Sequence, residues 1–389
     1  MTTPTLGQAF DLLAAYRPGG ALFERRGIGV ATSSVRDWVP AREAVARLRD
    51  LHGDGIGVAV GGLPFGDGEG SLAIAPRAVR RRALGGPPSI AELDGGDPTP
   101  FERVLGAGPA DAFTGLQLRE VPTAEGYAGA VEAATARIRG GAFAKVVLAR
   151  TIEVEAGRVL DPRRLAQRLR AVNPDAYTFA VPASGGVLVG ASPELLVARH
   201  GRVVTANPLA GSAARAGDPD EDRANAEALR TSAKNLEEHG IVVDVVAETL
   251  DPLCEELDRD PEPVLLGTPN VWHLSTRFRG VLRDPAPSSV ELALALHPTP
   301  AVGGSPSGAA LAAIRELEPF DRGAYAGPVG WVDGDGDGEW AIALRCALLD
   351  GERATLYAGA GIVADSDPHG EVDETERKFR AFLDALRWG

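Results

Sequence analysis

The stretch that decides the fold is GPVGWVDGDGDGEWAIALRCALLDG at 327–351, followed after one residue by RATLYAGAGIVADSD at 353–367. Two apolar runs separated by Gly and Asp predict a hairpin over 327–351 with the acidic turn at its tip. The second stretch predicts a strand that continues into a glycine loop, and EVDETERKFRAFLDALRW at 371–388 has the spacing of an amphipathic helix. Because successive strands follow one another through short turns, antiparallel pairing is favoured.

Outward from this stretch, strands and helices continue in runs. Strands are predicted at 55–65, 70–75, 144–156 and 271–282, and helices at 122–141, 161–172, 223–249, 288–297 and from 308 to about 317. The stretches 208–222 and 84–100 have turn chemistry and are predicted as loops, the latter a surface loop or internal linker. Since strands and helices do not alternate strictly, we expect an α+β fold with largely antiparallel sheet.

Composition excludes several classes of function. The 389 residues carry 40 Lys plus Arg against 54 Asp plus Glu, a formal charge of −14, which repels a phosphate backbone and argues against nucleic acid as a partner. No window approaches the roughly 18 uninterrupted apolar residues of a membrane-spanning helix, and the start does not resemble a signal peptide. Cys254 and Cys346 are too few for a disulfide framework. We expect a globular cytoplasmic protein.

Some motif-like segments do not complete their motifs. DGDGDGE at 333–339 imitates the start of a calcium loop, but its twelfth position is Leu344 instead of Glu, so a solvated hairpin tip is the better interpretation. GAG at 359–361 completes neither phosphate-binding glycine motif, and GASPEL at 190–195 has Glu194 where a nucleophile elbow needs Gly. On its own, Glu194 after an apolar strand is more often exposed than functional.

Three features nevertheless suggest a charged, partly buried site. Lys145 opens an apolar strand, Glu238 borders the buried stripe of its helix, and Glu371, Glu374 and Lys378 share one face of the last helix. One carboxylate from each of two helices could hold Mg²⁺, which binds few protein carboxylates and keeps several waters. Taken singly, each feature is more often an ordinary solvated face with ion pairs.

Together, nine segments resemble the chorismate-utilising enzymes, which include isochorismate, salicylate, anthranilate and aminodeoxychorismate synthases. They are AKVVLAR (144–150), GASPEL (190–195), NPLAGSAAR (207–215), EEHGIVVD (237–244), VWHLST (271–276), LHPTPAVGG (296–304), EPFDRGAYAGPVGW (318–331), WAIALRCA (340–347) and YAGAGIVADSDPHGEVDETERK (357–378). The resemblance covers roughly 120–389 in order and implies large, mostly antiparallel sheets flanked by helices. It is strongest to the isochorismate synthases of siderophore and menaquinone pathways, because Lys145 stands where the aminating relatives usually have Gln.

The resemblance implies a chemistry for the charged residues. Isomerisation of chorismate adds water at C2 and expels the C4 hydroxyl, so a base must activate the water and an acid must protonate the leaving group. Lys145 would be the base and Glu194 the acid, which requires a lowered pKa for the amine and a raised pKa for the carboxyl. Glu238 and Glu374 would hold Mg²⁺ at the ring carboxylate, with Glu371 in support.

The resemblance also implies a set of substrate-binding residues. Arg345 and the backbone of Gly359, Ala360 and Gly361 would hold the carboxylate of the enolpyruvyl arm, since this anion needs a cation and N–H donors. The remaining members of the set are Gly211, Ser212, His273, Ala301, Tyr325 and Lys378. One departure from the relatives is Asn235, where several carry an acidic residue three positions before the metal-binding Glu.

The domain organisation follows from where the resemblance lies. Residues 1–115 resemble the family only weakly, 116–389 form the chorismate-binding catalytic region, and we expect both to form one compact unit and a monomer. No amidotransferase segment is present, so no glutaminase subunit is expected. Two alternatives to isochorismate synthase stay open: a salicylate synthase, which also eliminates pyruvate, and a non-catalytic chorismate-binding subunit.

Overall fold

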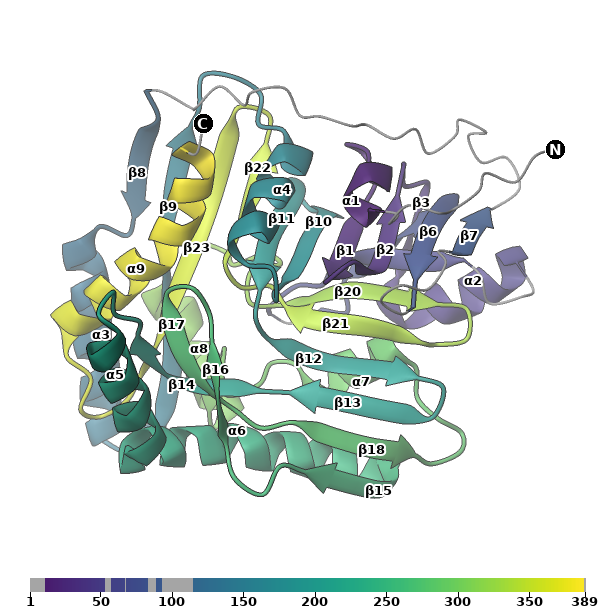
Figure 1. Ribbon diagram of the computed structural model, residues 1–389. Helices are drawn as coiled ribbons and strands as arrows, with labels where there is room; N and C mark the ends of the chain where they lie inside the picture. The colour runs from purple at the N-terminus through teal and green to yellow at the C-terminus, as the bar shows by residue number, and fades with distance from the viewer. Residues whose placement is uncertain (1–10, 53–56, 67, 83–88, 93–114, 388–389) are drawn as a thin grey trace.

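Two large β-sheets and one small sheet form the frame of the protein in a computed structural model (Figure 1). The structure describes residues 11–52, 57–66, 68–82, 89–92 and 115–387. The first sheet runs β19 (Gly304–Ser305), β9 (Lys145–Glu155), β23 (Arg353–Ile362), β22 (Cys346–Asp350), β11 (Gly186–Ser192), β10 (Tyr177–Ala183), β1 (Leu22–Arg25), β2 (Ile28–Thr32), β6 (Arg77–Arg81) and β7 (Ser89–Glu92), with β8 (Gln117–Val121) beside β9.

The second and third sheets carry the remaining described strands. The second runs β15 (Cys254–Arg259), β18 (Phe278–Leu282), β13 (Val203–Asn207), β12 (Leu195–His200), β21 (Gly338–Ile342), β20 (Pro328–Asp333), β4 (Val58–Gly62), β5 (Ser71–Ala75) and β3 (Asp37–Pro40). The third runs β14 (Leu209–Ala214), β17 (Val271–Ser275) and β16 (Val264–Gly267). Every strand pairing among the described residues is antiparallel, which confirms the predicted fold class.

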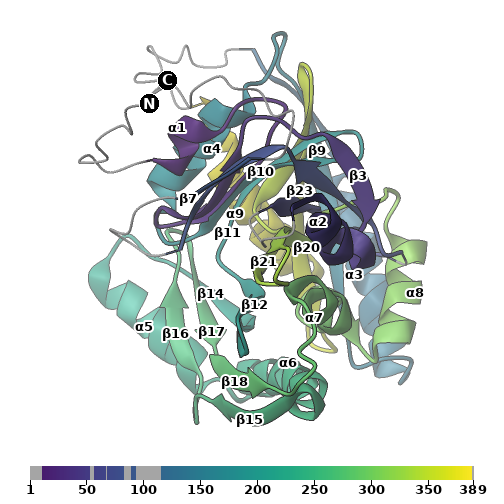
Figure 2. The ribbon, with the colours of Figure 1, turned by 90° about the vertical axis from the view of Figure 1, so that its right-hand side faces the viewer.

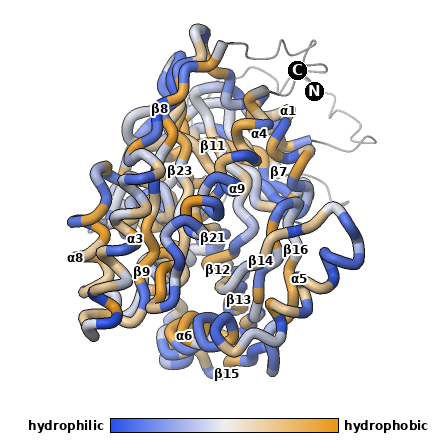
Figure 3. Tube along the Cα trace, turned by 90° about the vertical axis from the view of Figure 1, so that its left-hand side faces the viewer, coloured by the Kyte–Doolittle hydropathy of each residue, from blue (hydrophilic) through white to orange (hydrophobic). Residues whose placement is uncertain are grey.

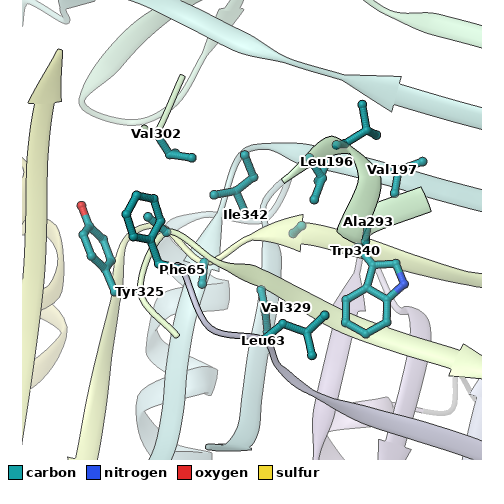
Figure 4. Packing of buried hydrophobic residues seen from close by; sticks show 14 of the residues in the cluster. Leu63, Phe65, Leu196, Val197, Ala293, Val302, Tyr325, Val329, Trp340 and Ile342 are labelled. Carbon is teal, nitrogen blue, oxygen red and sulfur yellow. The ribbon is translucent and has the colours of Figure 1, made fainter. Parts of the chain in front are cut away.

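Helices cover the sheets. They are α1 (Leu12–Ala15), α2 (Ala44–His52), α3 (Ala124–Arg139), α4 (Pro162–Val172), α5 (Pro219–Thr231), α6 (Ala233–Leu250), α7 (Ser289–Leu296), α8 (Ser307–Leu317) and α9 (Pro368–Arg387). α1, α4 and α9 share an apolar cluster with the first sheet, whereas α2 and α7 pack against the second sheet (Figure 2). The largest apolar cluster draws on both large sheets, and Figure 4 shows part of it around Val329 and Trp340. Among the described residues, no helix is long and apolar enough to cross a membrane.

Local sequence explains most helix boundaries. α3 begins after Thr123, whose side chain accepts the Gly126 N–H, and it ends at Gly140 as predicted. α4 begins after Asp161 with Pro162 in its first turn. The prediction of one helix over 223–249 is wrong, because Ser232 adopts an extended conformation, ends α5 and accepts the Asn235 N–H at the start of α6.

Two other predictions need correction. The predicted loop at 208–222 contains strand β14 and the start of α5, because β14 finds a partner in β17 that the sequence does not reveal. The predicted strand at 271–282 is two strands, β17 and β18, which belong to different sheets. Most of the predicted loop at 84–100 lies outside the described residues.

Two of the places where the chain passes between the two large sheets are neighbours in space. The chain leaves β11 in the first sheet through Pro193 and Glu194 and enters β12 in the second. It returns from β21 to β22 through 343–345, which interrupts the second strand of the predicted hairpin. The two passages are tied together, since Ile342 N–H donates to Glu194 O and Ala191 N–H donates to Arg345 O. Both passages therefore present side chains at the junction between the sheets.

Candidate active site

One pocket at this junction brings together all but one of the residues that the sequence predicts for the site. Its lining includes Lys145, Glu194, Gly211, Ser212, Glu238, His273, Ala301, Tyr325, Arg345, Gly359, Ala360, Gly361, Glu374 and Lys378. The elements that carry them, among them β9, β14, β23, α6 and α9, surround one region of the face seen in Figure 3. The exception is Glu371, one turn before Glu374 on α9, which does not line the pocket.

Lys145 is the first residue of β9 and is buried against α6. Its Nζ lies 2.7 Å from Glu238 Oε1. On the neighbouring strand β23, a Cβ added to Gly361 would lie 3.2 Å from both that oxygen and Lys145 Cε. Glycine at 361 thus leaves room for the Lys145–Glu238 ion pair against the strand.

Glu194 lies in the first passage between the sheets and is only 3% exposed. Its Oε1 accepts the Leu209 N–H at 3.3 Å. Burial raises the pKa of the Glu194 carboxyl to about 8, against the opposing effects of this hydrogen bond and of the charge on Lys145. The carboxyl is therefore mainly protonated at neutral pH. The interpretation from its local sequence, that Glu194 is exposed, is wrong, because β12 and β14 close over the passage.

Arg345 lies in the second passage and has a φ of +51°, a backbone conformation that residues other than glycine rarely adopt. Among the described residues, none forms a hydrogen bond or ion pair with its guanidinium, whereas the buried arginines all have such partners; these are Arg80, Arg150, Arg168 and Arg322. Residues held in such conformations concentrate at functional sites. Arg345 is thus a cation in the pocket wall with no hydrogen-bonded or ion-paired partner among the described residues, and the carboxylate whose charge acts on it is Glu374.

Helix α9 contributes a paired and an unpaired carboxylate. Lys378 Nζ lies 2.6 Å from Glu374 Oε1 and also donates to Gly359 O at 2.8 Å. Although burial opposes it, the Lys378 ammonium holds the pKa of Glu374 below its usual value. Burial, together with the nearby charge of Glu374, raises the pKa of Glu371 to about 7. Only one of these two carboxylates is fully charged at neutral pH.

The small sheet supplies a further polar wall of the pocket. His273 on β17 lies beside Ser212 on β14, and burial lowers the pKa of the imidazole to about 3, so His273 is neutral at physiological pH. Gly211 has a φ of +74°, and a Cβ there would lie 3.2 Å from Asn235 Cβ. Asn235 donates to Ser232 Oγ at the start of α6, so its amide supports the helix cap.

Comparisons with known proteins agree with this geometry. A family model described as “Chorismate binding enzyme” matches residues 108–387. The chain belongs to the chorismate-binding enzyme family. The resemblance that the nine segments indicate is thereby confirmed.

Individual members of the chorismate-binding enzyme family resemble the chain over most of its length. A Mycobacterium tuberculosis (strain CDC 1551 / Oshkosh) protein, provisionally named isochorismate synthase MenF, is 44% identical over 379 residues, which cover 95% of this chain and 96% of the relative. Isochorismate synthase DhbC of Bacillus subtilis (strain 168) is 45% identical over 276 residues, 69% of each chain. A Bacillus anthracis crystal structure, provisionally named 2,3-dihydroxybenzoate-specific isochorismate synthase DhbC, superimposes with a TM-score of 0.83 at 37% identity, covering 96% of this chain and 98% of that one.

Sequence reasoning missed Arg322, which lines this pocket, and Glu318, which pairs with Arg322 but does not line the pocket. Arg322 is buried, makes two hydrogen bonds to Glu318, and donates to Val147 O on β9 at 2.7 Å and to Val302 O at 3.0 Å. Glu318 Oε1 in turn accepts the Ala149 N–H at 2.7 Å. This ion pair satisfies the edge of β9 between its partners β19 and β8, two residues beyond Lys145.

Both residues of this pair stand in the motif segment EPFDRGAY (318–325), but the sequence analysis assigns only Tyr325 of this segment to the site. The Arg322 guanidinium stacks over Phe65, and Figure 4 shows Phe65 beside Tyr325. Tyr325 also stacks on Tyr357, with ring centroids 4.8 Å apart. The sequence could not show that the arginine reaches back to β9, because 175 residues separate Arg322 from Val147.

Proposed function

We propose that this chain is an isochorismate synthase, an isomerase that converts chorismate into isochorismate. The observation that carries the proposal is that a buried, protonated Glu194 and the buried Lys145 line one pocket with the unpartnered cation Arg345. These are the acid, the amine and the anion-binding group that the reaction needs. The names of the relatives support the same activity.

The residues of this pocket account for the proton transfers. Lys145 takes a proton from the water that attacks C2, the ring double bonds shift, and Glu194 gives its proton to the C4 hydroxyl, which leaves as water. Arg345 binds the carboxylate of the enolpyruvyl arm, and neutral His273 lines the pocket without repelling either cation. Lys145 forms an ion pair with Glu238 in the resting pocket, so the ammonium must give up one proton before its lone pair can accept another from the attacking water.

Glu238 and Glu374 are the residues we propose to hold Mg²⁺, with Glu371 in support. Each of the first two already faces a lysine ammonium across less than 3 Å, so both carboxylates are arranged toward a cation. Among the described residues, no three His, Cys, Asp or Glu side chains form a metal-binding group by themselves. The proposal therefore needs water and substrate oxygens beside these two carboxylates, and Mg²⁺ is an ion that binds few protein carboxylates and keeps several waters. When bound, Mg²⁺ would neutralise the ring carboxylate of the substrate.

Product analysis in H₂¹⁸O tests the proposal. The wild-type protein with Mg²⁺ should convert chorismate into isochorismate labelled at C2, with no aminated product when ammonium is supplied. Lys145→Ala should lose on the order of 10²–10⁴ in kcat. Fluorescent salicylate as the product would identify a salicylate synthase instead, and unchanged chorismate would identify a binding subunit without activity.

The proposal also covers the domain organisation, the oligomeric state and the cellular location of the protein. We place residues 1–115 and 116–389 in one compact unit; β1 pairs with β10 and β4 with β20, which supports this. We expect a cytoplasmic monomer that needs no glutaminase subunit, and both cysteines are free and buried, as suits a reducing compartment. The relatives' names favour a siderophore or menaquinone pathway for the product. Light scattering should give the mass of one chain.

A further inference from the structure

Two further cavities adjoin the active-site pocket, and they differ in charge. The first, here called the arginine cleft, has a volume of about 510 Å³ and shares Pro193 and Arg345 with the pocket. The second, here called the aromatic groove, has a volume of about 1340 Å³ and shares Arg322, Tyr325 and Tyr357 with it. Each shared set of residues lies between the pocket and one cavity, and is therefore a candidate place for the substrate to enter.

The charged residues lining the two cavities give opposite expectations for an anion. The arginine cleft is lined by Arg25, Arg26, Arg215 and Arg345 against a single acidic residue, Asp175, a formal charge of +3. Asp222, which pairs with Arg215 from outside the lining, reduces this to +2. The aromatic groove is lined by two arginines and two acidic residues and is formally neutral. The arginine cleft is thus positive in a chain whose total charge is −14.

The cleft arginines are held in place around the cavity. Arg26 lies 2.6 Å from Asp175, and Arg25 donates to the Asp175 carbonyl. Arg215 follows β14, which carries Ser212, and its guanidinium stacks over Trp272 at 4.2 Å. Arg345 stands where the cleft meets the pocket, and no described residue forms an ion pair or hydrogen bond with its guanidinium. Positive charge therefore continues from the protein surface along the cleft to Arg345.

We propose that the arginine cleft is the route by which the dianionic substrate reaches and leaves the pocket, an inference that rests on the proposed function. The overall charge of −14 repels a dianion at distances within the Debye length, about 10 Å at 0.1 M salt. A locally positive cleft focuses the field and raises the association rate there. The neutral aromatic groove offers no such attraction, and the stacked rings of Tyr325 and Tyr357 form its wall toward the pocket.

A pair of obstructing substitutions tests the route. Leu266 lines the cleft and pairs with His273 in the β16–β17 register, so its side chain lies on the same face of the small sheet as the imidazole. Leu266→Trp should lower the association and dissociation rate constants of chorismate by the same factor, about five- to tenfold, with Kd changed less than twofold. Gly66→Trp places the same bulk in the aromatic groove, where nothing lies within 4 Å of an added Cβ, and should change neither rate.

A pair of charge reversals tests the attraction. Arg26→Glu faces Asp175 in the cleft, whereas Arg119→Glu faces Glu153 in another exposed pair, which lines none of the three cavities. Arg26→Glu should slow association about three- to tenfold at 0.02 M salt, lose this effect near 0.5 M salt and leave kcat unchanged. Arg119→Glu should match the wild type at every ionic strength.

The outcomes separate this route from the proposed function. Rates are measured by stopped-flow tryptophan fluorescence with chorismate and Mg²⁺ before the first turnover, and thermal unfolding checks that each variant is folded. Slowing by Gly66→Trp alone, or equal effects of the two charge reversals, would overturn the arginine cleft as the route. A wild-type protein that neither binds nor converts chorismate would instead overturn the proposed function.

Discussion

The pocket has two walls that handle buried charge in opposite ways. At the passages between the large sheets, Glu194 has only a backbone N–H as its partner, and Arg345 has none among the described residues. On the helical side, Glu238 and Glu374 each face a lysine at 2.7 Å and 2.6 Å. Burying a charge without a partner is costly, so the first wall is stable only if its groups are neutral or their partner is the substrate.

In the proposed function, this difference separates the groups for proton transfer and anion binding from those for cation binding. An unpaired carboxyl in an apolar passage keeps its proton and can give it away, whereas a carboxylate paired with lysine stays charged and can exchange one cation for another. The four predictions below test the two walls, beginning with the largest expected effect.

The helical wall is tested by removing one of its charges. Glu238→Gln should reduce turnover on the order of 10³-fold, to the level of the wild type in excess EDTA, because charge stabilisation by a metal is worth several kcal/mol. Mg²⁺ should also raise the melting temperature of the wild type and not that of the variant. Glu237→Gln, on the exposed neighbour, is the control and should behave like the wild type. Full activity in excess chelator would contradict the assignment.

The acid in the passage wall should respond to pH. Glu194→Gln should lower kcat on the order of 10²–10⁴-fold with little change in KM, and kcat of the wild type should fall as pH rises through about 8. Burial raises the pKa of the Glu194 carboxyl from 4.5 to about 8 in the folded protein. The contribution of this group to stability is therefore fully present below pH 4.5 and is lost as pH rises toward 8.

The same variant gives a readout that does not depend on activity. Denaturant titrations should show that Glu194→Gln flattens this decline between pH 4.5 and 8. Glu24→Gln, at another buried glutamate of raised pKa that lies on β1 and does not line the pocket, is the matched control and should keep kcat. A Glu194→Gln enzyme that keeps kcat but binds chorismate poorly would make Glu194 a substrate-positioning residue.

The unpartnered cation should affect binding more than folding. Arg345→Met should weaken chorismate binding about 10- to 100-fold, because a charge-assisted hydrogen bond contributes about 1.5–3 kcal/mol, while the free energy of unfolding stays the same or rises. Arg168→Met provides the contrast, since Arg168 is buried and donates to the Ala385 carbonyl. That variant should unfold more easily and bind chorismate normally. Equal destabilisation of both would contradict the comparison.

The smallest effect is expected from the ion pair behind the pocket. Arg322→Lys keeps the charge but loses part of the hydrogen bonding to Val147 and Val302, so kcat should fall about tenfold with KM nearly constant and the pH profile shifted. Arg80→Lys, in the buried pair with Asp333, should lower the melting temperature similarly without changing kcat. Identical kinetics in the two variants would reduce Arg322 to a structural role.

Local patterns predicted much of the fold. Thr123 and Asp161 begin helices where predicted, and the hairpin turns between Asp333 and Gly338. The prediction of a solvated hairpin tip is only partly right, because Asp335 is exposed but Asp333 is buried against Arg80. The sequence could not show this partner, because β6 and β20 meet only after the two sheets assemble.

The sequence by itself determined the family, the antiparallel class and the identity of the charged residues, because hydrophobic period, turn chemistry and ordered motifs are local properties of the chain. Only the tertiary structure decided what those charges do. Glu194 keeps its proton because two sheets close around a passage of two residues, Arg345 has no ion-pair partner among the described residues because the chain turns back at the same junction, and Arg322 reaches β9 across 175 residues. Burial and long-range pairing set the protonation and orientation of a side chain, and both arise from packing between segments far apart in the sequence.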